Sequence, residues 1–66
     1  MSPRRLGLNL KRWREKRGLT QVALAKRAKI HPIYLAQLEL GTKKNPSFAI
    51  VQRLARALRV DIADLT

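Results

Sequence analysis

The chemically active side chains of this chain are mostly cationic, and their arrangement does not suggest catalysis. Fifteen lysine and arginine residues stand against four acidic residues in a chain of 66, which gives a formal net charge of +11. Cysteine is absent and His31 is the only histidine, so we expect no disulfide and no metal site. With four carboxylates and no phosphate-binding glycine loop, the chain is not expected to be an enzyme or to hold a cofactor. A charge this large attracts polyanions over long distances.

Residues 21–40 contain two short helical patterns separated by a very tight break. Thr20 precedes the first pattern as an N-cap, because its hydroxyl can accept from a free backbone N–H in the first helical turn. Pro32 suits the first position of the second helix, and the proline pushes His31 out of the α region, into a cap position. Only residues 29–31 remain to turn the chain. Two helices that are each too short to be stable alone, with so short a joint, predict a helix-turn-helix.

The second of these helices, over about residues 32–40, has two distinct faces at 100° per residue. One face, with Glu39 at its margin, consists of Tyr34, Leu35 and Leu38. The other consists of Pro32, Ile33, Ala36, Gln37 and Leu40. We expect the first stripe to be buried against the domain and the second to face a partner.

The spacing of these residues resembles the Cro/C1-type (XRE-like) helix-turn-helix family. The matching positions are residues 19–25, Ile30, Leu35, Leu38, Glu39, Gly41 and residues 45–48. The resemblance covers nearly the whole chain, from about Leu6 to Leu65. It implies an all-α, compact five-helix bundle, a lambda-repressor-like DNA-binding domain, in which the third helix is the DNA recognition helix.

The recognition helix implied by this resemblance would read double-stranded DNA in the major groove. The first residues of such a helix, and those one turn further along, reach base edges. The expected base contacts are Pro32, Ile33, Tyr34, Ala36 and Gln37. Among them Gln37 can bond to N6 and N7 of adenine, while Ile33 or Ala36 can pack on a thymine methyl group.

Phosphate contacts are expected on both sides of the recognition helix. Gln21 stands at a helix N-terminus, where free N–H groups and the helix dipole favour a phosphate, and the resemblance implies that it contacts the DNA backbone. Lys43, Lys44 and Asn45 lie in a polar loop directly after the recognition helix, from which they could reach phosphates. A soluble basic surface without a nucleic-acid partner is the less specific alternative.

Two further features follow from the resemblance. An arginine at the position of Arg14 is implied to pair with a glutamate at the end of the recognition helix, here Glu39. Lys29 departs from the family, which usually has glycine there because the turn residue takes positive φ. A lysine adopts that conformation at a cost of about 1 kcal/mol.

The remaining segments complete a helical domain. We expect a helix from Pro3 to about Arg17, in which Gly7 could permit close packing against another backbone. A later helix is predicted by a ladder of apolar residues, namely Phe48, Val51, Leu54, Ala55 and Leu58. A short final helix over residues 61–64 follows, and its Ile62 and the next apolar residue, Leu65, would complete the core or, alternatively, a dimer seam.

At the level of the whole chain, the sequence predicts one domain over residues 1–66, with the helix-turn-helix at about residues 21–40. No apolar run approaches the roughly 20 residues of a membrane span, so a cytoplasmic protein without a small-molecule ligand is expected. The favoured function is sequence-specific DNA binding by a repressor-like transcriptional regulator. It would act as a homodimer joined near Val60, Ile62 and Leu65. The alternative, kept open by the apolar residues of the outer face, is a protein-interaction or antitoxin-like module.

Overall fold

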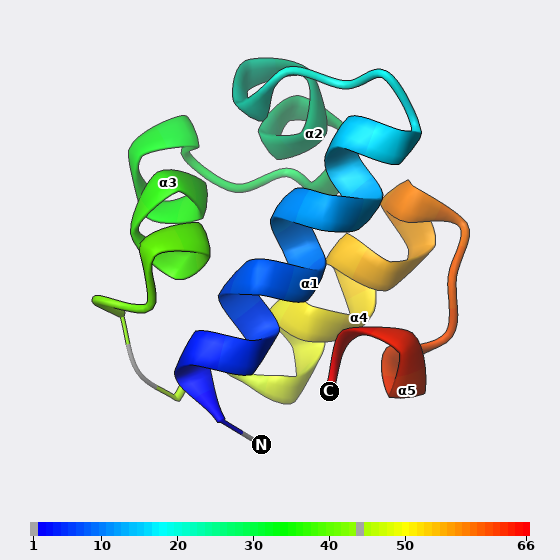
Figure 1. Ribbon diagram of the computed structural model, residues 1–66. Helices are drawn as coiled ribbons and strands as arrows, with labels where there is room; N and C mark the ends of the chain where they lie inside the picture. The colour runs from blue at the N-terminus through cyan, green and yellow to red at the C-terminus, as the bar shows by residue number, and fades with distance from the viewer. Residues whose placement is uncertain (1, 44) are drawn as a thin grey trace.

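The computed structural model describes residues 2–43 and 45–66, which form five α-helices and contain no strand. The helices are α1 (Pro3–Lys16), α2 (Gln21–Ala28), α3 (Pro32–Leu40), α4 (Phe48–Leu58) and α5 (Ile62–Leu65). In Figure 1, α1 runs diagonally through the middle of the molecule, with α3 on one side of it, α4 on the other and α2 at one end. The all-α five-helix architecture expected from the sequence is therefore confirmed.

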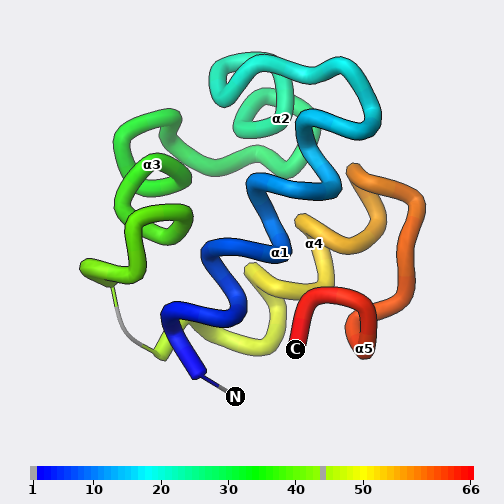
Figure 2. The backbone as a smooth tube through the Cα atoms, viewed as in Figure 1, coloured from blue at the N-terminus to red at the C-terminus, as the bar shows by residue number. Residues whose placement is uncertain are grey.

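A single core lies between these helices. α1 packs against α3, α4 and α5, while α2 packs against α3 and α4, so three later helices lie against the central helix (Figure 2). The fully buried apolar side chains are Leu6, Leu10, Leu24, Ala25, Ala28, Leu35, Leu38, Val51, Leu54, Ala55, Leu58 and Leu65. Leucine dominates this list because its flexible rotamers suit both helix formation and close packing between helices.

The helices begin where the sequence places a capping side chain. Thr20 accepts a hydrogen bond from the backbone N–H of Ala23, as expected, and His31 Nδ1 accepts one from Ile33. Ser47 caps α4 in the same way. These side chains satisfy backbone donors that have no partner within their own helix. Each cap therefore determines the residue at which its helix begins.

Two helices end on a cationic residue in the left-handed region. Lys29, after α2, has φ 58° and ψ 46°, and its N–H donates back to carbonyls of that helix. The positive φ expected for the turn is thus confirmed, although a lysine occupies it. Arg59 repeats the same backbone geometry after α4. A non-glycine residue costs about 1–2 kcal/mol in this conformation, so the surrounding packing must hold both turns in place.

α1 and α3 approach each other closely at Gly7. A Cβ atom on Gly7 would lie 2.5 Å from the carbonyl oxygens of both Leu38 and Glu39. The backbone of α1 therefore lies directly against the last turn of α3, in the space that a side chain would need. This contact sets the position of α3 on the domain.

We expect Gly7→Ala to destabilise the domain by about 1–3 kcal/mol, because the backbones of α1 and α3 must separate to accept the methyl group. The measurement is urea unfolding followed by circular dichroism. Leu8→Ala, at an exposed neighbouring position of the same helix, serves as the matched control and should change stability much less. A gain of about 1 kcal/mol for Gly7→Ala, the value expected from helix propensity alone, would contradict the packing argument.

Candidate nucleic-acid interface

The two faces of α3 separate as its sequence predicts. Leu35 and Leu38 are buried in the core, and Tyr34 is half-buried against it. On the opposite face Ile33 and Leu40 are 64% and 77% exposed. An apolar surface of this kind at the rim of a small domain is costly in water, so it marks a face available to a partner.

The residues expected to contact bases lie on or beside this outer face. Ile33 is exposed, while Pro32, Ala36 and Gln37 are half-buried. Tyr34 differs from these because its ring also packs against the core, so it stands at the flank of the face. The Gln37 side chain makes no hydrogen bond within the described part of the chain, and its amide is therefore unengaged by those residues.

Three helices meet at the carboxylate of Glu39. Arg14 donates from Nε to Glu39 Oε2 at 2.7 Å and from Nη2 to Oε1 at 3.1 Å, which makes a bidentate ion pair between α1 and α3. Gln21 Nε2, from α2, donates to the same Oε1 at 3.0 Å. A further Arg14 donor, Nη1, bonds to the carbonyl of Leu19 at 2.9 Å. The structure thus brings Arg14, Glu39 and Gln21 together in one network.

This network is shielded from water. The Arg14 and Glu39 side chains are only 11% and 3% exposed. The hydrogen bond from Arg14 to Glu39 raises the pKa of Arg14, against the opposing effect of its burial, so the guanidinium stays charged. Charge-assisted bidentate pairs are strong and directional, and this one fixes the orientation of α3 against α1.

Gln21 has one role predicted from the sequence and another observed in the structure. The sequence predicts a phosphate contact for it, whereas the structure places its amide nitrogen on Glu39. An amide nitrogen carries two N–H groups, so this bond leaves one for another acceptor. The sequence correctly placed Gln21 at a helix N-terminus, since it is the first residue of α2. The sequence did not reveal its bond to Glu39.

The loop after α3 folds back over the end of the helix. The N–H and the hydroxyl of Thr42 both donate to the carbonyl of Gln37, at 3.0 Å and 3.2 Å. Lys43 and Asn45 are exposed, and Asn45 has φ 57°. Lys44, the third residue expected to contact phosphate in this loop, lies outside the described residues.

The expected dimer residues differ in the surface that they offer. Val60 and Ile62 are half-buried against the core, whereas Leu65 is fully buried within the single chain. The Leu65 side chain therefore completes the core, one of the two roles its position predicted, and has no surface left for a second copy. The ladder of apolar residues that begins at Phe48 forms α4, as predicted. Phe48 itself is 68% exposed, because it is the first residue of α4, where the apolar stripe passes the edge of the core.

Neither a membrane-spanning helix nor a cluster of metal ligands is present in the described residues. None of the helices there combines the length and apolarity needed to cross a membrane. No group of three or more His, Asp or Glu side chains over residues 2–43 and 45–66 is arranged to hold a metal ion.

The chain is similar to known proteins in both sequence and fold. The profile of a helix-turn-helix family matches residues 10–65, most of the chain. A search of curated proteins finds no match.

Solved structures of regulators superpose closely on the whole domain. The restriction-modification controller protein C.AhdI from Aeromonas hydrophila is 28% identical, with a TM-score of 0.92 over 97% of this chain and 96% of its own. The clp gene regulator ClgR from Corynebacterium glutamicum is 31% identical, with a TM-score of 0.92 over 98% of this chain and 68% of its own. The master regulator for biofilm formation SinR, solved in complex with DNA, is 27% identical, with a TM-score of 0.87 over 91% of this chain and 95% of its own.

We expect Glu39→Ala to destabilise the domain by about 3 kcal/mol, because it leaves the shielded guanidinium of Arg14 without its counter-ion. The double change of Arg14 and Glu39 to methionine should recover much of this loss, since it removes both charges together. Denaturant unfolding of the wild type, the two single variants and the double variant forms a double-mutant cycle. Losses that simply add would show that the two side chains do not interact energetically.

Proposed function

This chain belongs to the Cro/C1-type helix-turn-helix family, a non-enzymatic family of DNA-binding regulators, and we propose that it binds double-stranded DNA sequence-specifically as a homodimeric, repressor-like transcriptional regulator. One observation carries the proposal. The inner face of α3 is anchored by Glu39 and the core, while its outer face, with Ile33 64% exposed, is left uncovered. A rigidly held helix with a free face is what insertion into a major groove requires.

In this proposal the outer face of α3 reads bases. Gln37 has an amide that can bond bidentately to adenine, and it has no competing partner among the described residues. Ile33 offers an exposed apolar side chain of the kind that packs on a thymine methyl group. Pro32, Ala36 and Tyr34 flank these two and shape the contact.

Phosphate binding would come from both sides of this face. Gln21 begins α2, at a helix N-terminus that favours an anion, and Lys43 and Asn45 are exposed just beyond the end of α3. Lys44 belongs to the same proposed group. Glu39 holds the Gln21 side chain, so the network that anchors α3 also orients a phosphate-binding amide. Base reading and phosphate binding would therefore share one rigid support.

Dimerisation is proposed because one short helix covers too few base pairs to distinguish a site in a genome. Twofold association doubles the site and spaces the half-sites by about one helical turn. Val60 and Ile62 each retain partial exposure, and the exposed ring of Phe48 adds an apolar group that the single chain leaves uncovered. The positive charge of the chain opposes self-association at low salt, so DNA binding would assist the pairing.

The exposed Ile33 and Leu40 also support a second candidate, a module whose α3 contacts another protein. The two functions differ in their response to DNA and salt. A DNA reader should retain particular fragments from a genomic mixture in the presence of competitor DNA, whereas a protein-contact module should retain none. The net charge of +11 favours the DNA reader.

For the wild type bound to duplex DNA as a dimer, log K against log[salt] should have a slope of about −4 to −6, from two or three phosphate contacts per subunit. Lys43→Ala should make this slope less steep by about one for each site and should weaken binding to all sequences alike. Fluorescence anisotropy titrations at several salt concentrations measure both effects. A complex insensitive to salt would refute the phosphate contacts.

Gln37→Ala should weaken binding to the preferred site by about 1–3 kcal/mol and relax the preference at one base pair in each half-site. Binding to unrelated DNA should hardly change, because phosphate contacts provide it. Footprinting and selection from a randomised duplex pool measure the site and its two halves. A single unrepeated footprint, or a uniform loss of affinity on all sequences, would contradict the proposed dimeric reader.

A further inference from the structure

We infer that the DNA-binding surface extends beyond α3 onto the first turn of α1, where Arg4 binds a backbone phosphate. The inference rests on the proposed DNA binding and adds to it a contact on a helix outside the helix-turn-helix. It concerns a residue that is not among the phosphate contacts expected from the sequence.

The backbone of α1 places Arg4 at the end of the recognition helix. A Cβ atom built on Gly41, the C-cap of α3, would lie 3.5 Å from the Cα of Arg4 and 3.8 Å from its backbone nitrogen. The close approach at Gly7, one turn further along α1, holds the two helices in this register. The position of Arg4 relative to α3 is therefore set by backbone packing and not by a flexible arm.

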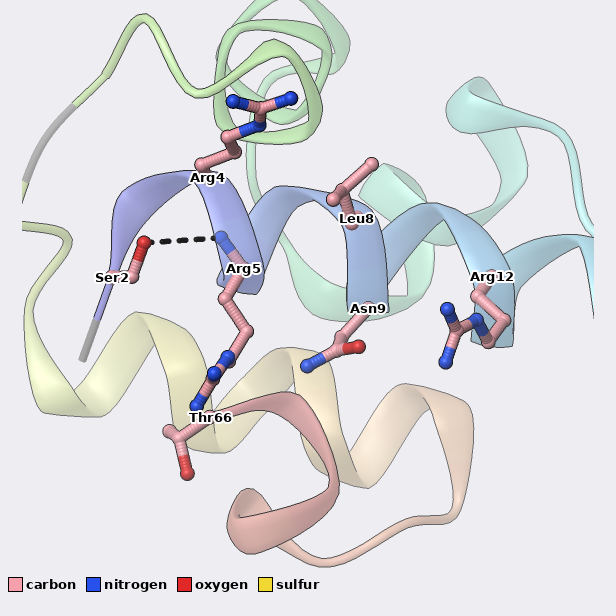
Figure 3. A pocket seen from close by; sticks show the side chains of 7 residues that line it. All are labelled: Ser2, Arg4, Arg5, Leu8, Asn9, Arg12 and Thr66. Atoms are coloured by element: carbon pink, nitrogen blue, oxygen red, sulfur yellow. Dashed lines mark hydrogen bonds between the residues drawn. The ribbon is translucent and has the colours of Figure 1, made fainter.

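Three arginines of α1, namely Arg4, Arg5 and Arg12, point in different directions. They line an open groove together with Ser2, Leu8, Asn9 and Thr66. In Figure 3, Arg4 extends to the side of α1 where the end of α3 lies, whereas Arg5 extends toward Thr66 and Arg12 lies further along the helix, away from both. Only Arg4 thus continues the surface formed by α3.

Arg4 is also available to bind an anion. It is exposed, and the sole ion pair formed among residues 2–43 and 45–66 is the one between Arg14 and Glu39. A helix lying in the major groove has the phosphates of the groove walls beyond its ends, and arginine can bond to a phosphate through two N–H groups at once. Exposed Lys43, in the loop that folds back on α3, would accompany it at the same end.

The test compares Arg4→Ala with Arg12→Ala, which removes the same charge from an exposed position of the same helix. Arg4→Lys is included because it retains the charge. Each variant is titrated by fluorescence anisotropy with a random-sequence DNA duplex and with a duplex that the wild type retains from genomic fragments. Titrations are repeated at several salt concentrations, and thermal unfolding checks that each variant is folded.

Arg4→Ala should make the slope of log K against log[salt] less steep by about 0.9 for each bound chain, on both duplexes, because one phosphate contact is lost. Arg12→Ala should change the slope much less, and Arg4→Lys should stay near the wild type. If Arg4→Ala and Arg12→Ala are indistinguishable while the wild type binds DNA normally, this inference is overturned and the proposed function stands. If the wild type binds neither duplex, the proposed function fails and this inference fails with it.

Discussion

The placement of α3 depends on the shielded ion pair between Arg14 and Glu39. An ion pair of this kind contributes little net stability, since removing two charges from water is costly, but it is highly directional. Here one carboxylate accepts hydrogen bonds from α1 and α2 while belonging to α3. The last turn of α3 is thereby fixed to both neighbours, and the exposed face at its other side keeps one orientation.

Backbone and apolar contacts also hold α3 in this position. Gly7 lets the backbone of α1 touch the last turn of α3, and Leu35 and Leu38 fill the space below it. A polar network and a close backbone contact therefore act on the same turn. This combination allows a domain with a small core to hold α3 rigidly.

The bounds of the helices could be predicted from the sequence because they depend on local chemistry. Thr20, His31 and Pro32 define the two helix starts of the helix-turn-helix through caps and a fixed φ. The positive φ of Lys29 was implied by the family resemblance, in which this turn position usually carries glycine.

What the sequence could not predict depends on contacts between distant segments. Phe48 lies on the apolar stripe of α4, yet its exposure depends on where the core of the assembled domain ends. No local pattern indicates that Arg17 Nε donates to the carbonyl of Leu58 at 2.8 Å, 41 residues away. The position of Gln21 at a helix N-terminus was predicted, whereas its bond to Glu39 depends on how α2 and α3 meet. The base and phosphate contacts themselves are decided by a partner and stay predictions.

The environment of Trp13 allows its fluorescence to report on the folding of the chain. This is the only tryptophan, it packs beside the core, and the charged groups of Lys16 and Arg17 lie 4.9 Å and 5.1 Å from the centre of its ring. Arg17 also ties the end of α1 to the end of α4. Because unfolding exposes the partly buried indole to water and melts the helix that places these cations beside it, its fluorescence follows global unfolding without an added dye. The indole belongs to the core side of α1, apart from the outer face of α3, so the same signal can be recorded with a ligand on that face.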